Sequence, residues 1–164
     1  MRFFVLFLIL NTSLLAQKGV WYKDMADAIA NPDSVFQLQL KRKGFNTFPS
    51  ELSRFPNLQK LDLSKNKIGA FPDSLSHLKR LTFLDLSRNK IASIPATIRQ
   101  LIFLEHLDLW HNDIDALPSQ LSELPHLNYL DIRGVSMSHD DYRKYKEMME
   151  GVDFYMSEPC DCQE

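Results

Sequence analysis

Apolar residues recur along this chain with a period of 23 residues. Shifting the sequence by 23 positions aligns apolar residues with apolar residues from position 38 onward, without an insertion or a deletion. The two most regular columns are Leu38, Leu61, Leu84, Leu107, Leu130 and Leu40, Leu63, Leu86, Leu109, Ile132. Further columns hold Asn66, Asn89, Asn112 and Pro49, Pro72, Pro95, Pro118. The period indicates a repeat architecture in which each unit is one small supersecondary structure.

The first part of each unit predicts a strand and a turn. Residues 61–63 alternate leucine, aspartate and leucine, so the two leucines point to one side, as in a half-buried strand. An asparagine follows at Asn66, Asn89 and Asn112. A buried asparagine amide can bond backbone groups of its own and neighbouring units. The spacing therefore predicts a ladder of stacked asparagines.

The second part of each unit predicts a short helix. Pro72 can occupy a first helical position, where its missing N–H costs nothing, and Leu75, Leu78 and Leu81 follow at intervals of three. This spacing favours a 3₁₀ helix. One 23-residue unit cannot bury its own leucines, so the units must stack, with parallel strands on one face and helical segments on the other.

The pattern L-x-x-L-x-L-x-x-N-x-I-x-x-F/L-P-x-x-L-x-x-L, from residue 38 to about residue 137, resembles the leucine-rich repeat family. Within that family, the 23-residue length and the LPxxL tail look most like the Ras-suppressor-like class. The resemblance implies an α/β solenoid with a curved parallel sheet on the concave face and short helical or 3₁₀ segments on the convex face. The family is chiefly a protein-recognition scaffold, so the resemblance implies binding and no shared catalytic centre.

The N-terminal end of the repeat predicts a cap. Lys43 stands where the ladder asparagine is expected, because a terminal unit has a neighbour on one side only. Residues 22–30 carry Met25, Ala28 and Ile29 at helical spacing and stop before Pro32. We expect this helix to seal the N-terminal end of the core.

The C-terminal end predicts a helix followed by a strand. Ser138 and Asp141 resemble a capping box, and apolar residues then recur at helical spacing as far as Gly151. Val152 and Phe154 lie 22 residues beyond Leu130 and Ile132, which predicts a further strand. The expected organisation is a signal peptide at 1–16, an N-terminal helical cap at 17–37, repeats at 38–137, a C-terminal helix–strand cap at 138–156 and a tail at 157–164.

The first sixteen residues read as an export signal. Arg2 gives a positive start, residues 3–10 are apolar throughout, and Ala16 offers a cleavage point. The apolar run is shorter than the roughly 20 residues of a membrane span, so we expect no span after its removal. Export would place Cys160 and Cys162 in an oxidising compartment, where they either pair in a tight disulfide or remain thiols on the tail.

Composition excludes several functional classes. A net charge of -2 gives no basic footprint for nucleic acid, and 45% hydrophobic residues is too many for a disordered chain. The sequence lacks the nucleophile elbow, the phosphate-binding glycine loop and the H-E-x-x-H pair. We therefore expect a protein that is not an enzyme and carries no cofactor. A metal held by His106, Asp108 and His111 is a minor alternative.

The candidate ligand-binding residues alternate with the buried leucines, so they face outward. Their side chains are not required by the repeat pattern. An aspartate column is frequent in this repeat family, and we interpret it as a solvated row paired with neighbouring basic residues. The fourth unit differs most from the others at these outward positions. It carries Trp110 and His111 where other units carry serine and a basic residue. The candidate site comprises Phe83, Asp85, His106, Asp108, Trp110, His111, Tyr129, Asp131 and Arg133. Clustered exposed aromatic residues are typical of recognition surfaces.

The function that we predict is binding of a protein or an extended peptide on the concave face, by a protein that is secreted, periplasmic or at the cell surface. Five strands give a face of roughly 300 Å², against about 800 Å² per partner in a standard interface. Binding should therefore be weak, directed at an extended peptide, or aided by self-association. The alternative is a glycan or cell-wall ligand that stacks on Trp110 and Tyr129.

The signal peptide gives a first testable prediction. Protein recovered from its own host should begin at Gln17, because cleavage after Ala16 removes the apolar run. Intact-mass measurement and N-terminal sequencing check this. Recovery mainly as a membrane-embedded chain that retains Met1 would contradict it.

Overall fold

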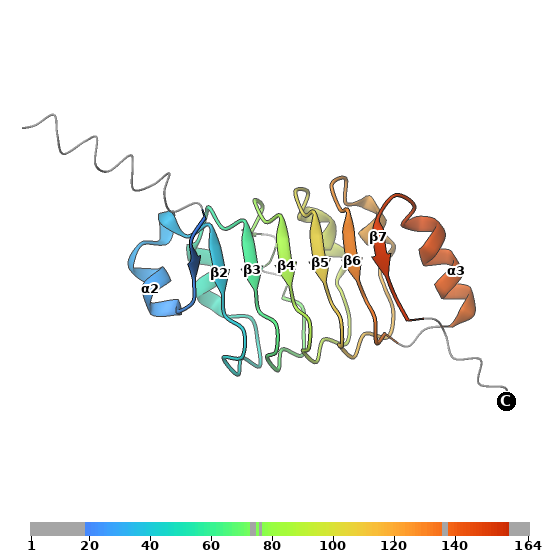
Figure 1. Cartoon of the computed structure of the whole chain (residues 1–164), viewed down its shortest axis with the longest axis horizontal. Helices are drawn as coiled ribbons and strands as arrows, with labels where there is room; N and C mark the ends of the chain where they lie inside the picture. The colour runs from blue at the N-terminus through green and yellow to red at the C-terminus, as the bar shows by residue number, and fades with distance from the viewer. Residues whose placement is uncertain (1–18, 73–74, 76, 136–137, 158–164) are drawn as a thin grey trace, which may run out of the picture.

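Parallel strands form one side of the molecule and short helices form the other. The computed structural model describes residues 19–72, 75, 77–135 and 138–157. Within them, an open, uncurled sheet runs in chain order through β1 (Trp21–Tyr22), β2 (Gln37–Gln39), β3 (Lys60–Asp62), β4 (Phe83–Asp85), β5 (His106–Asp108), β6 (Tyr129–Asp131) and β7 (Asp153–Tyr155) (Figure 1). The predicted signal peptide, Cys160 and Cys162 lie outside the described residues.

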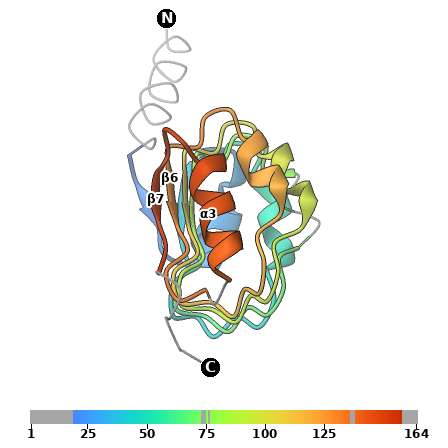
Figure 2. The same cartoon turned by 90° about the vertical axis from the view of Figure 1, so that its right-hand side faces the viewer.

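The helical side of each unit follows its proline. The 3₁₀ helices are η1 (Pro32–Ser34), η2 (Ser50–Arg54), η4 (Ala96–Gln100) and η5 (Ser119–Glu123). Pro49, Pro95 and Pro118 stand directly before η2, η4 and η5, in extended backbone. Figure 2 shows the strands and these helices as two opposite walls. The leucine columns fill the space between the walls, so the predicted 3₁₀ segments and the solenoid are confirmed.

The 23-residue period sets the strand register. Leu38 pairs with Leu61, Leu61 with Leu84, Leu84 with Leu107 and Leu107 with Leu130. All five leucines are fully buried. Residues at equivalent positions of successive units therefore form straight rows across the sheet, one strand spacing apart.

The predicted asparagine ladder is present. The Asn89 amide donates to the Leu63 and Leu86 carbonyls at 3.1 and 2.8 Å, and its oxygen accepts from the Ile68 N–H at 3.0 Å. The Asn66 and Asn112 amides bond their own and the preceding unit in the same way. Each amide thus satisfies buried backbone groups of two units at once.

A strand at the N-terminal end was missed from sequence. Trp21 and Tyr22 pair with Gln37 and Leu38 of β2, so the helix expected over 22–30 begins only at Met25, as α2 (Met25–Ala30). Aromatic residues suit a strand, and the edge of β2 offers unpaired backbone groups. The Asp24 carboxylate then accepts from the Ala26 N–H at 2.8 Å and caps the helix.

The C-terminal strand exists, but its predicted register was wrong. Leu130 pairs with Phe154, a separation of 24 residues and not 22. Side chains alternate with period 2 along a strand, so both separations put the same residues toward the core and the pattern cannot distinguish them. Between β6 and β7 the chain forms α3 (His139–Met148) and then a turn in which Gly151 has a φ of 88°.

A helix lies at each end of the sheet (Figure 1). Ala28 of α2 and Tyr145 of α3 are buried in the same apolar cluster as the leucines. The Tyr145 hydroxyl donates to the Leu117 carbonyl at 2.6 Å, and the Ser138 hydroxyl accepts from the Asp141 N–H as the capping box predicts. That the two helices act as caps stays a prediction.

The ladder gives a second testable prediction. Asn112→Ala should lower the free energy of unfolding by about 1 to 3 kcal/mol per buried group left unpaired. Asp113→Ala, at the exposed neighbouring position, should change it by less than about 0.5 kcal/mol. Urea denaturation measures both. Equal midpoints with unchanged slopes for the two variants would show that the Asn112 amide does not stabilise the stack.

Candidate functional site

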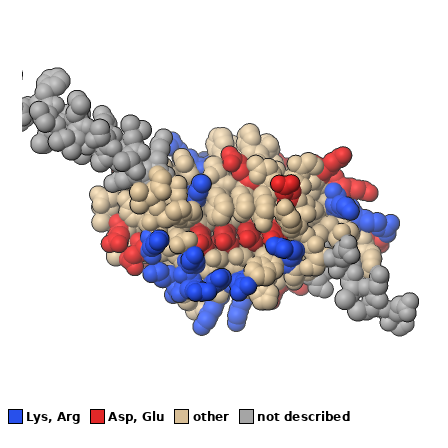
Figure 3. Space-filling view, viewed as in Figure 1, with Lys and Arg blue, Asp and Glu red and all other residues tan. Residues whose placement is uncertain are grey.

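The candidate site lies on the surface formed by the outward side chains of the strands, here called the sheet face. Figure 3 views this face and shows a straight row of acidic side chains across the strands. Basic side chains gather on one side of that row, and uncharged residues form a band on the other. The register makes these rows, because the residues at each strand position pair with one another along the sheet.

The acidic row consists of Asp62, Asp85, Asp108 and Asp131, and its first role is structural. Each carboxylate accepts from the backbone N–H two residues further on, at 2.9 to 3.0 Å. This local bond turns the chain as it leaves the strand. Asp62 and Asp131 are only 7% and 1% exposed, so the expected solvation is wrong for these two residues. Burial follows because the side chains fold back onto their own turns. The expected pairing with a basic residue is present at Asp131, which bonds Arg133.

Asp108 differs from the other three carboxylates. Asp62 and Asp85 also accept from serine hydroxyls, and Asp131 accepts from the guanidinium of Arg133. In the fourth unit the serine is replaced by Trp110, so the Trp110 N–H is the one donor to Asp108 among the described residues. Oδ2 of Asp108 accepts no hydrogen bond from the described residues. The same holds for Oδ2 of Asp85, because both bonds from Ser87 go to Oδ1, so Asp108 differs in having one donor and not two.

Burial and neighbouring charges raise the pKa of Asp108. Desolvation is the largest cause, the Trp110 N–H lowers the value, and repulsion from Asp85 and Asp131 raises it further, giving a pKa of about 6. Burial also raises the pKa of Asp85, against the two bonds from Ser87. A carboxylate that lacks water and hydrogen-bond donors gains most when a ligand supplies a cation or an N–H group.

A row of aromatic rings forms much of the band beside the aspartates. Phe83 stacks on His106 with ring centroids 4.4 Å apart, and His106 stacks on Tyr129 at 3.9 Å, both nearly parallel. Trp21 meets Phe83 edge-on at 6.4 Å, and Tyr155 meets Tyr129 at 5.3 Å. The rings come from β1, β4, β5, β6 and β7, whereas the equivalent positions of β2 and β3 hold Gln37 and Lys60. Both faces of His106 are covered, so the row presents ring edges to solvent.

Trp110 does not join this row, although the sequence analysis placed it near Phe83, His106 and Tyr129. It lies across the acidic row, with the guanidinium of Arg88 over its ring at 4.4 Å and that of Arg133 at 6.0 Å. The reason is its strand position. Trp110 is four residues beyond His106, which is roughly 13 Å along an extended strand. The expected single aromatic patch is therefore two groups on either side of the aspartates.

The remaining predicted site residues are Arg133, His106 and His111, and each has a distinct set of contacts. Arg133 bonds Asp131 through its guanidinium at 3.0 and 3.1 Å, and this partner raises the pKa of Arg133 above its ordinary value. Burial lowers the pKa of His106 and outweighs the opposing effect of Asp131. His106 is thus a neutral imidazole at pH 7, with one donor and one acceptor. His111 is exposed beside Trp110, with ring centroids 5.9 Å apart.

Three contributing residues escaped the sequence analysis of the site. Trp21 was assigned to the N-terminal cap and Tyr155 to the C-terminal cap, yet their rings end the aromatic row. Arg88 was recognised as basic but not as the partner of Trp110. A 24-residue spacing would have placed Tyr155 beside Asp131, whereas nothing in the repeat period could place Trp21.

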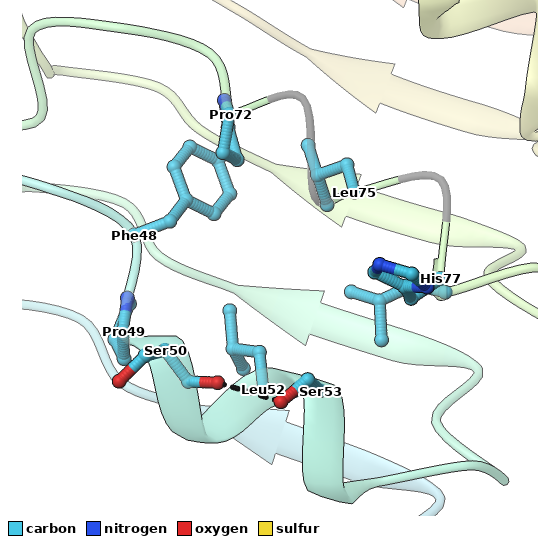
Figure 4. Close-up of a pocket in the computed structure, with 9 residues that line it drawn as sticks. Phe48, Pro49, Ser50, Leu52, Ser53, Pro72, Leu75 and His77 are labelled. Carbon is cyan, nitrogen blue, oxygen red and sulfur yellow. Dashed lines mark hydrogen bonds between the residues drawn. The ribbon is translucent and has the colours of Figure 1, made fainter.

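A pocket on the helical side of the molecule shares no residue with the sheet face. Phe48, Pro49 and Leu52 line one wall and Pro72, Leu75 and His77 line the other, and Figure 4 shows the two walls facing each other. The Ser53 hydroxyl donates to the Ser50 carbonyl at 2.8 Å within η2. The pocket is lined by the apolar helical segments of two stacked units. We therefore do not include the pocket in the candidate site.

The sheet face offers hydrogen-bonding groups and ring edges on an open surface. Among the described residues, no group of three or more His, Cys, Asp or Glu side chains could hold a metal ion. Both oxygens of Asp62 and Asp131, and Oδ1 of Asp85, already accept bonds from groups of this chain. What the face can do chemically is bind a donor at Asp108, an acceptor at His106 and an extended chain along the rows.

Comparison with known proteins identifies the family. Models of the leucine-rich repeat match residues 32–91 and 103–124, half of the chain in all. The chain belongs to the leucine-rich repeat family. The Ras-suppressor-like class stays a prediction. No match was found among the curated proteins with which the sequence was compared.

Solved structures show the same fold. A leucine-rich repeat protein of Leptospira interrogans is similar, with a TM-score of 0.71, 28% identity and coverage of 84% of this chain and 35% of that one. An internalin of Listeria monocytogenes has a TM-score of 0.61, 20% identity and coverage of 83% and 40%. The third is the ectodomain of the plant membrane receptor kinase GASSHO1/SCHENGEN3 from Arabidopsis thaliana, in complex with CASPARIAN STRIP INTEGRITY FACTOR 2. Its TM-score is 0.58, its identity 28% and its coverage 72% and 14%.

The chain is shorter than these neighbours, spanning about a third of the Leptospira interrogans protein. Within the part of the chain that the structure describes, no helix is long and apolar enough to cross a membrane.

The raised pKa of Asp108 gives a third testable prediction. Folding raises this pKa from 3.8 to about 6, so the folded state binds the proton more tightly than the unfolded chain. Stability from this group is greatest below pH 4 and is lost as the pH rises through 6. Asp108→Asn should therefore raise the free energy of unfolding at pH 7 by about 1 kcal/mol, after solvent screening of a partly exposed group.

Urea denaturation at pH 4 and pH 7 measures the effect. The gain should be absent at pH 4, where the native carboxyl is already protonated. Asp115→Asn, at an exposed loop position, is the matched control and should change stability little at either pH. An equal gain for Asp108→Asn at both pH values would show that its charge is not the cause.

Proposed function

We propose that this protein is exported and that its sheet face binds an extended peptide, either free or as a segment of a larger protein. The observation that carries the proposal is the break in the acidic row at Asp108. There the serine of other units is replaced by Trp110, so Asp108 has a single donor among the described residues, whereas Asp62 and Asp85 accept a further bond from a serine hydroxyl. Export is supported by the signal-like residues 1–16 and by similarity to a receptor ectodomain.

The size of the sheet face favours a peptide over a globular partner. Seven short strands, each about 4.8 Å from the next, give a face of roughly 400 Å². A standard interface needs about 800 Å² on each partner. An extended chain lying across the strands would use the full length of the rows. The ectodomain from Arabidopsis thaliana was solved with a bound partner, which supports partner binding by this fold.

Three side chains of the sheet face determine which groups of a peptide could bind there: Asp108, His106 and Trp110. A basic side chain or a terminal amine would bind the free oxygen of Asp108. The edge of the His106 ring would donate to or accept from a backbone amide. The edge of the Trp110 ring, whose face is covered by Arg88, would contact an apolar side chain of the peptide. Buried aromatic residues of this kind commonly dominate binding energy.

The stacking geometry disfavours the glycan alternative. Sugar rings bind aromatic side chains through an exposed ring face. Tyr129 stacks on His106 at 3.9 Å and meets Tyr155 at 5.3 Å, and Trp110 lies beneath a guanidinium. We therefore propose peptide recognition. We also propose no catalytic activity, because the carboxylates are in an open row and not in an enclosed pocket that separates the pKa values of an acid and a base.

The proposal gives a fourth testable prediction. Dodecapeptides selected on the wild-type protein from a random display library should bind more weakly to Trp110→Ala, by at least about 2 kcal/mol or roughly 30-fold. The free energy of unfolding should move by less than about 1 kcal/mol, because Trp110 is outside the leucine core. Calorimetric titration and urea denaturation measure the two quantities.

Phe103→Ala is the matched control, because Phe103 is an exposed aromatic residue outside the sheet face. It should leave the affinity of the same peptides unchanged. Equal affinity for wild type and Trp110→Ala, or unfolding of Trp110→Ala, would overturn the assignment. Enrichment of glycans on an array, with no peptide selected, would favour the glycan alternative instead.

A further inference from the structure

The loops that follow β2, β3 and β4 carry an uncompensated concentration of positive charge. Residues 40–48, 63–71 and 86–94 contain no aspartate or glutamate. They hold Lys41, Arg42, Lys43, Lys65, Lys67, Arg88 and Lys90, here called the basic rim. These seven residues are among the 19 lysines and arginines of a chain whose net charge is -2, so the loops are a local excess of positive charge. Figure 3 shows Lys and Arg side chains gathered along one side of the acidic row.

Little in the described chain neutralises the basic rim. Lys43 contacts Asp24 at 3.6 Å, with both side chains well exposed, and Arg88 lies over Trp110. No ion pair within the described residues involves Lys41, Arg42, Lys65, Lys67 or Lys90. The acidic row lies beside these loops, but none of its carboxylates forms an ion pair with a rim residue within the described part of the chain.

The backbone holds three of these residues in a conformation that favours glycine. Arg42, Lys65 and Arg88 have φ values of 58°, 57° and 55°. A side chain in this left-handed region costs free energy, and glycine or asparagine fits it better. His111 and Gly134, at the equivalent positions of the next two units, also have positive φ, so the turn of each unit imposes this conformation. Three successive units nevertheless carry a basic residue where glycine or asparagine fits better, which favours a role for these side chains outside the fold.

Hydrogen bonds between the loops place these charges in a straight line. The Arg42 N–H donates to the Ser64 carbonyl, the Lys65 N–H to the Ser87 carbonyl and the Lys90 N–H to the Ile68 carbonyl, at 2.9 to 3.2 Å. Successive loops therefore lie one strand spacing apart, about 4.8 Å. A linear ligand with closely spaced negative charges matches this arrangement.

We propose that the basic rim is a second binding surface, which takes an extended acidic segment of a partner protein. On one side of an extended chain, carboxylates recur about every 6.6 Å, so four to six acidic residues span the three loops. A membrane surface fits less well, because it is two-dimensional and is commonly entered by apolar side chains. The large apolar residues exposed in the described chain are Val20, Ile102, Phe103 and Tyr155, and none lies in these loops.

The test measures binding of a fluorescein-labelled octaglutamate peptide to the full-length protein by fluorescence anisotropy. The triple variant Arg42→Asn, Lys65→Asn, Lys90→Asn removes one charge from each loop, and asparagine tolerates the left-handed backbone. Its affinity should fall at least tenfold at low salt, and wild-type binding should weaken as salt is added. The melting temperature should stay equal to that of the wild type or rise.

The control variant Lys79→Asn, Lys144→Asn, Lys146→Asn removes the same charge from exposed positions outside the rim. It should bind octaglutamate within twofold of the wild type. An equal loss in both variants, or no binding to the wild type, would overturn the proposal. Tighter binding to phosphatidylglycerol vesicles than to octaglutamate would overturn the choice of a peptide. None of these variants changes Trp110 or Asp108, so this result is independent of the proposed peptide site.

Discussion

The inability of one 23-residue unit to bury its own leucines is the constraint on which the structure depends. Stacking solves it, because each unit then covers the leucines of the next, and the asparagine amides join the backbones of adjacent units. The bonds of Asn66, Asn89 and Asn112 satisfy carbonyls that the turning chain would otherwise bury unpaired. Since every unit obeys the same constraint, equivalent residues lie side by side.

This alignment explains how the candidate site arises. In a row of equivalent residues, a residue whose contacts differ from the others is a candidate for function. In the acidic row that residue is Asp108. Asp62 and Asp85 each accept a second bond, from a serine hydroxyl, whereas the fourth unit carries Trp110 at that position. One substitution thus removes a donor from a carboxylate and adds an aromatic ring. The carboxylate remains in place because its other oxygen still forms the turn.

The same alignment also places an aromatic surface and a basic surface on opposite sides of the acidic row. Aromatic rings stack across the strands on one side of the aspartates, and basic residues follow the strands on the other. Stacked rings rigidify the row and leave edges for contact, while the unpaired basic side chains extend into solvent. The two surfaces therefore suit different ligand chemistry, which is why their tests use different variants.

The sequence by itself determined the repeat, the strand positions, the asparagine ladder and the residues facing outward, because each follows from a period of 23 or an alternation of 2. It could not determine the register of β7, since shifts of 22 and 24 bury the same residues. It also missed β1, because Trp21 and Tyr22 lie outside the period. The separation of Trp110 from the aromatic row, its contact with Arg88 and the unpaired oxygen of Asp108 were decided by tertiary structure. Those features depend on which side chains of different units meet, and periodicity does not encode that choice.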